Sequence, residues 1–195
     1  IISASSENHE HSNCLMIAVM THGNTHGLLY TKDNMIRVEE IWAPFNGEKC
    51  KSLIGKPKIF LIQACRGSMQ DIGAVHEYQV DDTALCSRSS KVPDMNKFVI
   101  PTMADFLIFF SSAEGYPSFR DSGDGSWFVQ AVCAAFQSCY DSKVDTDLMK
   151  IFTQINRAIA FAKQAKTQNQ FDACKQMPVI VSMLTKTFML GAKGV

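Results

Sequence analysis

The stretch CLMIAVMTHG, residues 14–23, begins as a continuous apolar run and ends at a histidine and a glycine. An apolar run of this length is typical of a strand that is covered on both faces, as in a parallel sheet. A second such run, KIFLIQACRG at residues 58–67, ends at a cysteine. Because ligands collect outside the carboxyl ends of strands in open α/β sheets, we expect His22 and Cys65 to face one cleft.

The remaining patterns alternate between strand and helix. Residues 37–45 place apolar side chains at helical spacing between the two apolar runs. Two more apolar runs follow at 106–110 and 179–184. Between them lie two longer helical patterns, at about 125–140 and about 146–166. This order predicts an α/β fold with helices packed on a mostly parallel sheet. Residues 67–104 are polar and aperiodic, which indicates a long functional or disordered loop.

Composition limits the class of protein. A chain of 195 residues that is 46% hydrophobic predicts one globular domain. Nineteen basic and nineteen acidic residues cancel, which argues against binding to nucleic acid or to an anionic membrane surface. Seven cysteines without a C-x-x-C pair, and no secretory leader at the start, favour reduced thiols in a cytosolic protein. No apolar run reaches the roughly 20 residues that a membrane-spanning helix needs.

A cysteine and a histidine at one cleft can perform nucleophilic catalysis. The thiolate is the attacking form, and a nearby imidazole can take the thiol proton and later deliver it to the leaving amine. Read singly, such a histidine is more often a structural residue, and such a cysteine more often a small core side chain. His9, His11 and His26 have no cysteine or acidic residue at useful ligand spacing, so we expect solvated histidines, no metal and no cofactor.

Several separate segments resemble the caspase family. The pentapeptide QACRG at 63–67 is a caspase nucleophile motif, and His22 lies 43 positions upstream of its cysteine. Other matching segments are THG at 21–23, GKPKIF at 55–60, GYPSFR at 115–120, DGSWF at 124–128 and PVIVSMLTK at 178–186. The resemblance runs from about His11 to about Leu190 and is to executioner members. It implies the caspase-like three-layer α/β fold, with helices on both faces of a mostly parallel central sheet.

The resemblance also implies roles for individual residues. Cys65 would be the nucleophile and His22 the general acid/base, while the N–H groups of Gly23 and Cys65 would form the oxyanion hole. Gln63 and Arg120 would line the pocket for the substrate aspartate, which suits a guanidinium that binds a carboxylate through two hydrogen bonds.

Three further residues would contact the substrate outside that pocket. Ser118 would offer backbone groups to an extended substrate, which would bind as an added strand. Phe119 and Trp127 would be walls of the subsites further from the scissile bond, although aromatic residues read singly are more often core side chains.

The resemblance further predicts how the chain is divided. Within one catalytic domain, 1–195, it implies a large-subunit part at about 11–80, a processing linker at about 81–100 and a small-subunit part at about 101–195. Candidate cleavage sites are Asp81, Asp82 and Asp94. The first strand and helix of the family, which bring a second arginine to the aspartate pocket, have no counterpart before His11, so we expect a domain that lacks its amino-terminal part. Pro117 stands where many members carry a bulky aromatic residue.

The function that the resemblance implies is a cytoplasmic cysteine endopeptidase that cleaves proteins after aspartate in apoptosis. It would be made as a zymogen and work as a dimer of large/small subunit pairs. Upstream caspases and inhibitor-of-apoptosis proteins would be further partners. One alternative is a catalytically inactive caspase-like regulator that binds true caspases. Another is a related peptidase that prefers a basic residue or asparagine, for which Arg120 makes poor electrostatic sense.

Overall fold

The computed structural model describes residues 1–74 and 99–191. Its centre is a four-stranded sheet with the order β1-β4-β5-β9. The strands are β1 (Leu15–Met20), β4 (Lys58–Gln63), β5 (Phe106–Phe110) and β9 (Val179–Ser182). The first three are parallel and β9 is antiparallel to β5. The predicted mostly parallel sheet is therefore confirmed, and each of the four predicted apolar runs contains one of its strands.

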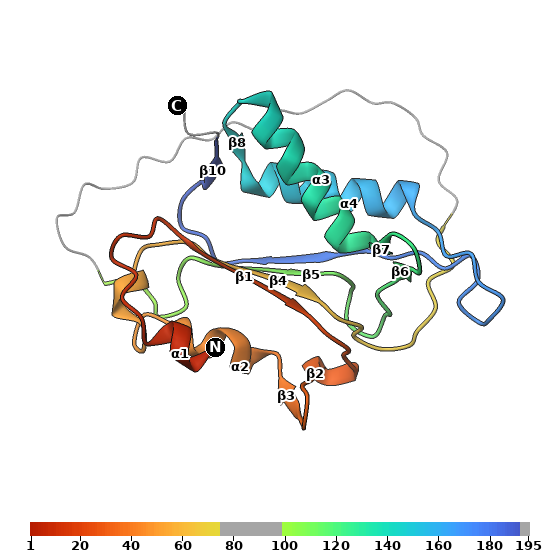
Figure 1. Ribbon diagram of the computed structural model, residues 1–195, viewed down its shortest axis with the longest axis horizontal. Helices are drawn as coiled ribbons and strands as arrows, with labels where there is room; N and C mark the ends of the chain where they lie inside the picture. The colour runs from red at the N-terminus through yellow and green to blue at the C-terminus, as the bar shows by residue number, and fades with distance from the viewer. Residues whose placement is uncertain (75–98, 192–195) are drawn as a thin grey trace.

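Helices cover both faces of the sheet (Figure 1). On one face lie α3 (Trp127–Ser142) and α4 (Leu148–Ala162). On the other lie α1 (Ile2–Ser5), α2 (Glu39–Trp42) and the 3-10 turn η2 (Ala43–Phe45). The remaining elements are η1 (Thr25–Gly27), β2 (Leu28–Tyr30), β3 (Met35–Arg37), η3 (Lys51–Leu53), β6 (Arg120–Asp121), β7 (Gly125–Ser126), β8 (Thr146–Asp147) and β10 (Met189–Leu190). The predicted three-layer α/β arrangement is thus what the structure has.

Strand β5 shows how one apolar sequence serves both layers. All five of its residues are buried. Phe106, Ile108 and Phe110 belong to the core on the α2 side, whereas Leu107 and Phe109 belong to the core beneath α3 and α4. Successive side chains of a strand point to opposite faces, so a strand between two layers has no polar position.

The two long helices begin where side chains cap them. The Ser126 hydroxyl accepts a hydrogen bond from the N–H of Val129 at 3.2 Å, and an Asp147 carboxylate oxygen accepts one from Met149 at 3.0 Å. Each cap satisfies an N–H group that has no partner within the helix. Helix α4 then buries a regular apolar stripe, composed of Leu148, Ile151, Phe152, Ile155 and Ile159. Each such side chain stabilises the fold by about 1.5–3 kcal/mol.

The helix expected over residues 37–45 is only partly correct. Arg37 ends strand β3, and α2 is a single turn that gives way to a 3-10 turn at Ala43. Pro44 explains the break, because a proline has no N–H to continue an α-helix and its ring clashes with the preceding turn. Ile41 and Phe45 are nevertheless buried, so the apolar spacing did identify side chains that face the core.

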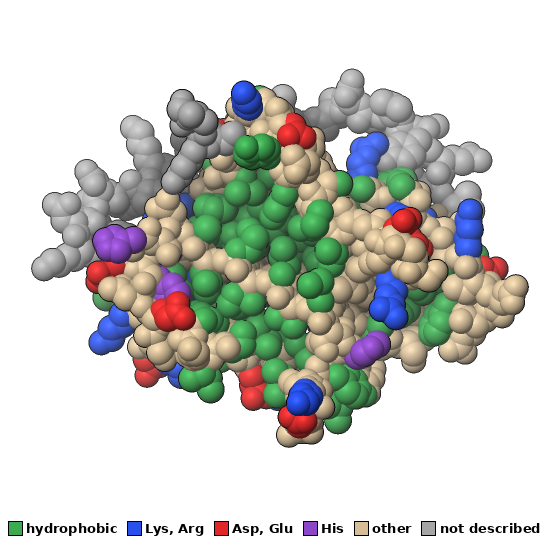
Figure 2. Space-filling view, in the orientation of Figure 1, with side chains coloured by type: hydrophobic (Ala, Val, Ile, Leu, Met, Phe, Trp, Pro, Cys, Tyr) green, Lys and Arg blue, Asp and Glu red, His purple; other side chains and the backbone are tan. Residues whose placement is uncertain are grey.

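Strand β1 lies at an edge of the sheet and its residues alternate between half-buried and exposed. Met16 and Met20 are exposed on it. Figure 2 shows hydrophobic side chains gathered in the middle of this face of the molecule, over β1 and α3. In the described part of the chain, no helix is long and apolar enough to cross a membrane.

Candidate active site

The turns that follow β1 and β4 are in contact. The last paired residues of these parallel strands are Met20 and Gln63, so His22 and Cys65 each lie two residues beyond the sheet. Gly23 packs so closely on the Cys65 turn that an added Cβ would overlap the Cys65 carbonyl oxygen and lie 3.0 Å from the Cβ of Ala64. The topology therefore brings the two turns together at one edge, and only glycine fits at position 23 without movement.

Two backbone donors at this contact have no acceptor among the described residues: the N–H groups of Gly23 and Cys65. Their neighbours are paired, since Asn24 donates to the carbonyl of Leu28 at 2.9 Å and Ala64 donates to the Ser111 hydroxyl at 3.3 Å. Backbone N–H groups are rarely left without a partner. Two such donors on adjoining turns are what the binding of an oxyanion requires.

The Cys65 thiol contacts the segment that was predicted to bind substrate. The N–H of Ser118 donates to the Cys65 sulfur at 3.4 Å, and the thiol donates to the Ser118 carbonyl at 3.7 Å. The backbone of Ser118 thus bonds to the nucleophile candidate through both its N–H and its carbonyl. An extended substrate that paired with Ser118 would have to replace these contacts.

The His22 imidazole is exposed and has no hydrogen bond to any residue that the structure describes. Its backbone is fixed, because the His22 carbonyl accepts from the N–H of Tyr30 at 2.9 Å. An imidazole held by its backbone alone can turn about its side-chain torsions toward a bound substrate.

Gln63 lies at the start of the Cys65 turn and uses both ends of its amide. Its Nε2 donates to the Ser118 hydroxyl at 2.9 Å, and its Oε1 accepts from the Ser126 hydroxyl at 2.5 Å. The amide N–H that was predicted to bind the substrate carboxylate is therefore partly occupied by a hydroxyl of the same chain. Gln63 and Ser118 do lie next to each other, as their predicted roles at one site require.

Arg120 is exposed on β6, opposite Ser126 of β7. Within residues 1–74 and 99–191, no acidic side chain forms an ion pair with its guanidinium. Since Ser126 also bonds to Gln63, this register places the arginine on the hairpin that adjoins the predicted aspartate pocket. An exposed guanidinium without an acidic partner is available for a carboxylate from outside.

An aromatic cluster adjoins this hairpin. The rings of Phe119 and Trp127 lie 5.1 Å apart, and Phe171 packs on Phe119 at 6.2 Å. The indole N–H of Trp127 donates to Asp121 at 3.0 Å. Trp127 is only 4% exposed, so it is largely a core residue, whereas Phe119 is half-buried and retains some exposed surface.

The sequence interpretation missed two residues of this region. Phe171 stands alone in a polar segment, where no periodicity indicates burial. Gln176 is 2% exposed, accepts from the N–H of Phe119 at 2.6 Å and donates to the Ser111 carbonyl at 2.8 Å. Neither side chain carries a sequence signal that could have identified it, because both act through contacts with distant segments.

The other predicted residues divide into described and undescribed positions. Asp81, Asp82 and Asp94, the candidate cleavage sites, lie outside the described residues. Pro117 is buried. The ring of His9 hydrogen-bonds to the Ala4 carbonyl at 2.8 Å, and the described residues contain no group of three or more His, Cys, Asp or Glu that could hold a metal.

The fold and the two contacting turns define the class of protein, an α/β protein with a cysteine and histidine at the carboxyl ends of neighbouring strands. The model of the Caspase domain family matches residues 2–189, so the chain belongs to this family. The executioner-like resemblance is supported by relatives. The chain is 37% identical over 185 residues to Caspase-3 of Mesocricetus auratus, covering 94% of this chain and 61% of that protein.

Two more relatives agree. Caspase-7 of Gallus gallus is 36% identical over 184 residues, covering 94% of this chain and 57% of that protein. The crystal structure of Caspase-1 from Spodoptera frugiperda has a TM-score of 0.83 and 32% identity, covering 98% of this chain and 70% of that chain. The chain thus spans about three fifths of the length of the curated relatives that it matches.

Proposed function

We propose that this chain is the main part of a cysteine endopeptidase that cleaves proteins after aspartate. The observation that carries the proposal is the contact of the His22–Gly23 turn with Cys65, where the N–H groups of Gly23 and Cys65 have no acceptor among the described residues. Membership of the caspase domain family supports a cysteine peptidase. The exposed Arg120, which pairs with Ser126 while the Ser126 hydroxyl bonds to Gln63, supports an acidic substrate residue.

The chemistry begins when a substrate replaces Ser118 at the Cys65 sulfur. His22 accepts the thiol proton, the sulfur forms a bond to the scissile carbonyl carbon, and the N–H groups of Gly23 and Cys65 bind the resulting oxyanion. The tetrahedral intermediate collapses and the carbon–nitrogen bond breaks, while the imidazolium gives its proton to the leaving amine. Water, deprotonated by His22, then attacks the thioester carbon. The carbon–sulfur bond breaks, the product leaves with a new carboxyl terminus, and the imidazolium returns the proton to the Cys65 sulfur.

The specificity is tested with peptides that end in Asp, Asn or Lys before a fluorogenic amide, incubated with the full-length protein. Cleavage only after Asp, abolished by Cys65→Ala, is the expected result. Arg120→Ala is expected to lower kcat/KM. The loss of transition-state stabilisation should be about 1.5–3 kcal/mol, the contribution of a hydrogen bond to a charged group. Arg157→Ala, which removes an exposed arginine on α4, is the control.

Absence of any cleavage by a processed dimer would reject the proposal in favour of an inactive regulator. Cleavage after Lys or Asn would reject the aspartate specificity. An unchanged kcat/KM in Arg120→Ala would reject the pocket assignment alone. The specificity, the role of Cys65 and the pocket are thus tested separately.

The same proposal includes processing within about 81–100, between a large-subunit part at about 11–80 and a small-subunit part at about 101–195. It also includes a zymogen, a dimer of large/small subunit pairs, and an apoptotic role in the cytoplasm, with upstream caspases and inhibitor-of-apoptosis proteins as partners. Similarity to Caspase-3 and Caspase-7 supports the apoptotic role and the dimer among these statements. Mass spectrometry of the mature protein would locate the cut, and loss of activity in a variant that cannot be cut there is expected.

A further inference from the structure

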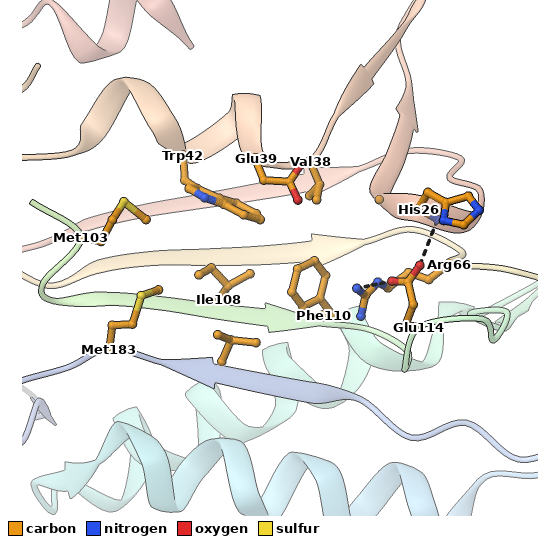
Figure 3. A pocket seen from close by; sticks show the side chains of 12 residues that line it. His26, Val38, Glu39, Trp42, Arg66, Met103, Ile108, Phe110, Glu114 and Met183 are labelled. Carbon is orange, nitrogen blue, oxygen red and sulfur yellow. Dashed lines mark hydrogen bonds and ion pairs between the residues drawn. The ribbon is translucent and has the colours of Figure 1, made fainter.

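One carboxylate links the loops that follow three neighbouring parallel strands. Glu114, in the turn after β5, forms an ion pair through Oε2 with the Arg66 guanidinium, in the turn after β4. Its Oε1 accepts a hydrogen bond at 3.0 Å from the backbone N–H of His26, in the η1 turn after β1. Figure 3 shows the three residues together at one end of a cavity of about 450 Å³. Glu114 therefore touches both turns that carry the catalytic candidates.

The Arg66 side chain, one end of this link, is held in place by contacts of its own. Its guanidinium lies over the Phe110 ring, 4.1 Å from the centroid, and donates to the Ser112 carbonyl at 3.4 Å. Its side chain is only 18% exposed. Burial lowers the pKa of Arg66, while the negative charge of Glu114 acts in the opposite direction. A largely buried cation needs a compensating charge, and Glu114 is its ion-pair partner.

His26 is the residue through which Glu114 contacts the turn that carries His22. Its backbone is left-handed, with φ 61° and ψ 27°. This conformation is disfavoured for residues other than glycine and persists where surrounding contacts hold it. The hydrogen bond from its N–H to Glu114 is such a contact. His26 lies four residues after His22 on the same short turn, and Gly23 of that turn packs on Cys65.

We propose that Glu114 is a positioning residue, which holds the His22 turn against the Cys65 turn through the N–H of His26 and the guanidinium of Arg66. The role rests on the proposed peptidase function and deepens it. Glu114 contacts neither the sulfur nor the imidazole, so its effect is on where the two groups meet. Loss of the link would let the His22 turn drift, and a misplacement of about 1 Å can cost a hundredfold in rate.

The test compares Glu114→Ala with Glu39→Ala in the full-length protein. Glu39 lines the same cavity and places negative charge near Arg66, but its ion pair is with Arg37. For Glu114→Ala we expect kcat with an Asp peptide to fall by about tenfold or more, with KM changed less than about twofold. We expect Glu39→Ala to retain the parent kcat.

A second readout does not need substrate cleavage. The pH dependence of Cys65 alkylation, followed for that peptide by mass spectrometry because the chain has seven cysteines, reports how well the imidazole supports the thiolate. For Glu114→Ala the profile is expected to move to higher pH. If the parent protein cleaves nothing yet this shift occurs, the positioning role stands and the peptidase proposal fails.

Conservative variants separate positioning from mere folding. Glu114→Gln retains an oxygen that can accept from His26 and should lie between the parent and Glu114→Ala in both readouts. His26→Gly removes the backbone strain, so adding it to Glu114→Ala should restore part of kcat. A parent-like kcat and alkylation profile in Glu114→Ala would overturn the proposal. So would a loss of kcat that follows only a lower urea midpoint, with no shift of the alkylation profile and no recovery by His26→Gly.

Discussion

Substitution of Gly23 by alanine probes the contact between the two turns directly. The new Cβ would overlap the Cys65 carbonyl oxygen and lie 3.2 Å from the Leu28 carbonyl oxygen, where ordinary contact begins at 3.4 Å. The overlap with Cys65 requires the turns to separate by about 1 Å, since neither neighbour is the flexible end of a side chain.

A separation of that size acts on the reacting groups. Misplacement by about 1 Å can cost a hundredfold in rate, or about 2.7 kcal/mol of barrier. We therefore expect Gly23→Ala to lower kcat/KM with an Asp peptide by about a hundredfold. The loss should appear mainly in kcat, because Gln63 and Arg120, the residues proposed to bind the substrate aspartate, lie on β4 and β6 rather than on the His22 turn.

Gly123→Ala is the matched control, because a Cβ at that position meets nothing within 4 Å and its φ is not in the left-handed region. We expect it to retain the parent kcat/KM and thermal midpoint. The assay is the initial rate over a range of peptide concentrations, with the fraction of folded protein measured by circular dichroism. If folded Gly23→Ala cleaved at the parent rate, the close approach of the turns would have no part in catalysis.

Two other predictions concern Gln63 and Lys58. Ser118→Ala removes the hydroxyl that accepts from Gln63 Nε2, so this donor would be available to the substrate carboxylate and KM should fall by up to about fivefold, which is about 1 kcal/mol. The control is Ser142→Ala, whose hydroxyl bonds only at the end of α3 and which should not change KM. A raised KM in Ser118→Ala would contradict the idea that Ser118 competes with the substrate for Gln63. Burial lowers the pKa of Lys58, with the Asp105 charge acting against that shift. The unfolded chain then binds the proton more tightly than the folded protein, so the free energy of unfolding should rise as the pH increases from the lowered pKa toward 10.5. Urea unfolding between pH 7 and pH 10 should show this rise relative to Lys58→Met, and parallel curves for the two proteins would contradict it.

The strands and the main helices were predictable because the burial of each produces a recognisable pattern of apolar residues in the sequence. Phe106–Phe110 can be apolar throughout only where both faces are covered, and the stripe on α4 repeats at helical spacing. The short α2 was less predictable, because Pro44 breaks a pattern whose apolar spacing continues into the next turn.

The candidate site was only partly predictable for a different reason. The positions of His22 and Cys65 follow from strand ends, which the sequence marks. The bonds of Ser118 to the thiol, of Gln176 to Phe119 and of Glu114 to His26 join residues at least 53 positions apart. Such contacts depend on how loops fold over the sheet edge, and no local pattern of residues encodes them.

The most direct test of the central claim is a crystal structure of the full-length protein with a peptide aldehyde that ends in aspartate. The account predicts a bond from the Cys65 sulfur to the aldehyde carbon, with the resulting oxygen at the N–H groups of Gly23 and Cys65. It also predicts the His22 imidazole within hydrogen-bond reach of the adduct and the aspartate at Gln63 and Arg120. An unmodified Cys65 still bonded to Ser118, or an adduct with the imidazole turned away, would contradict it.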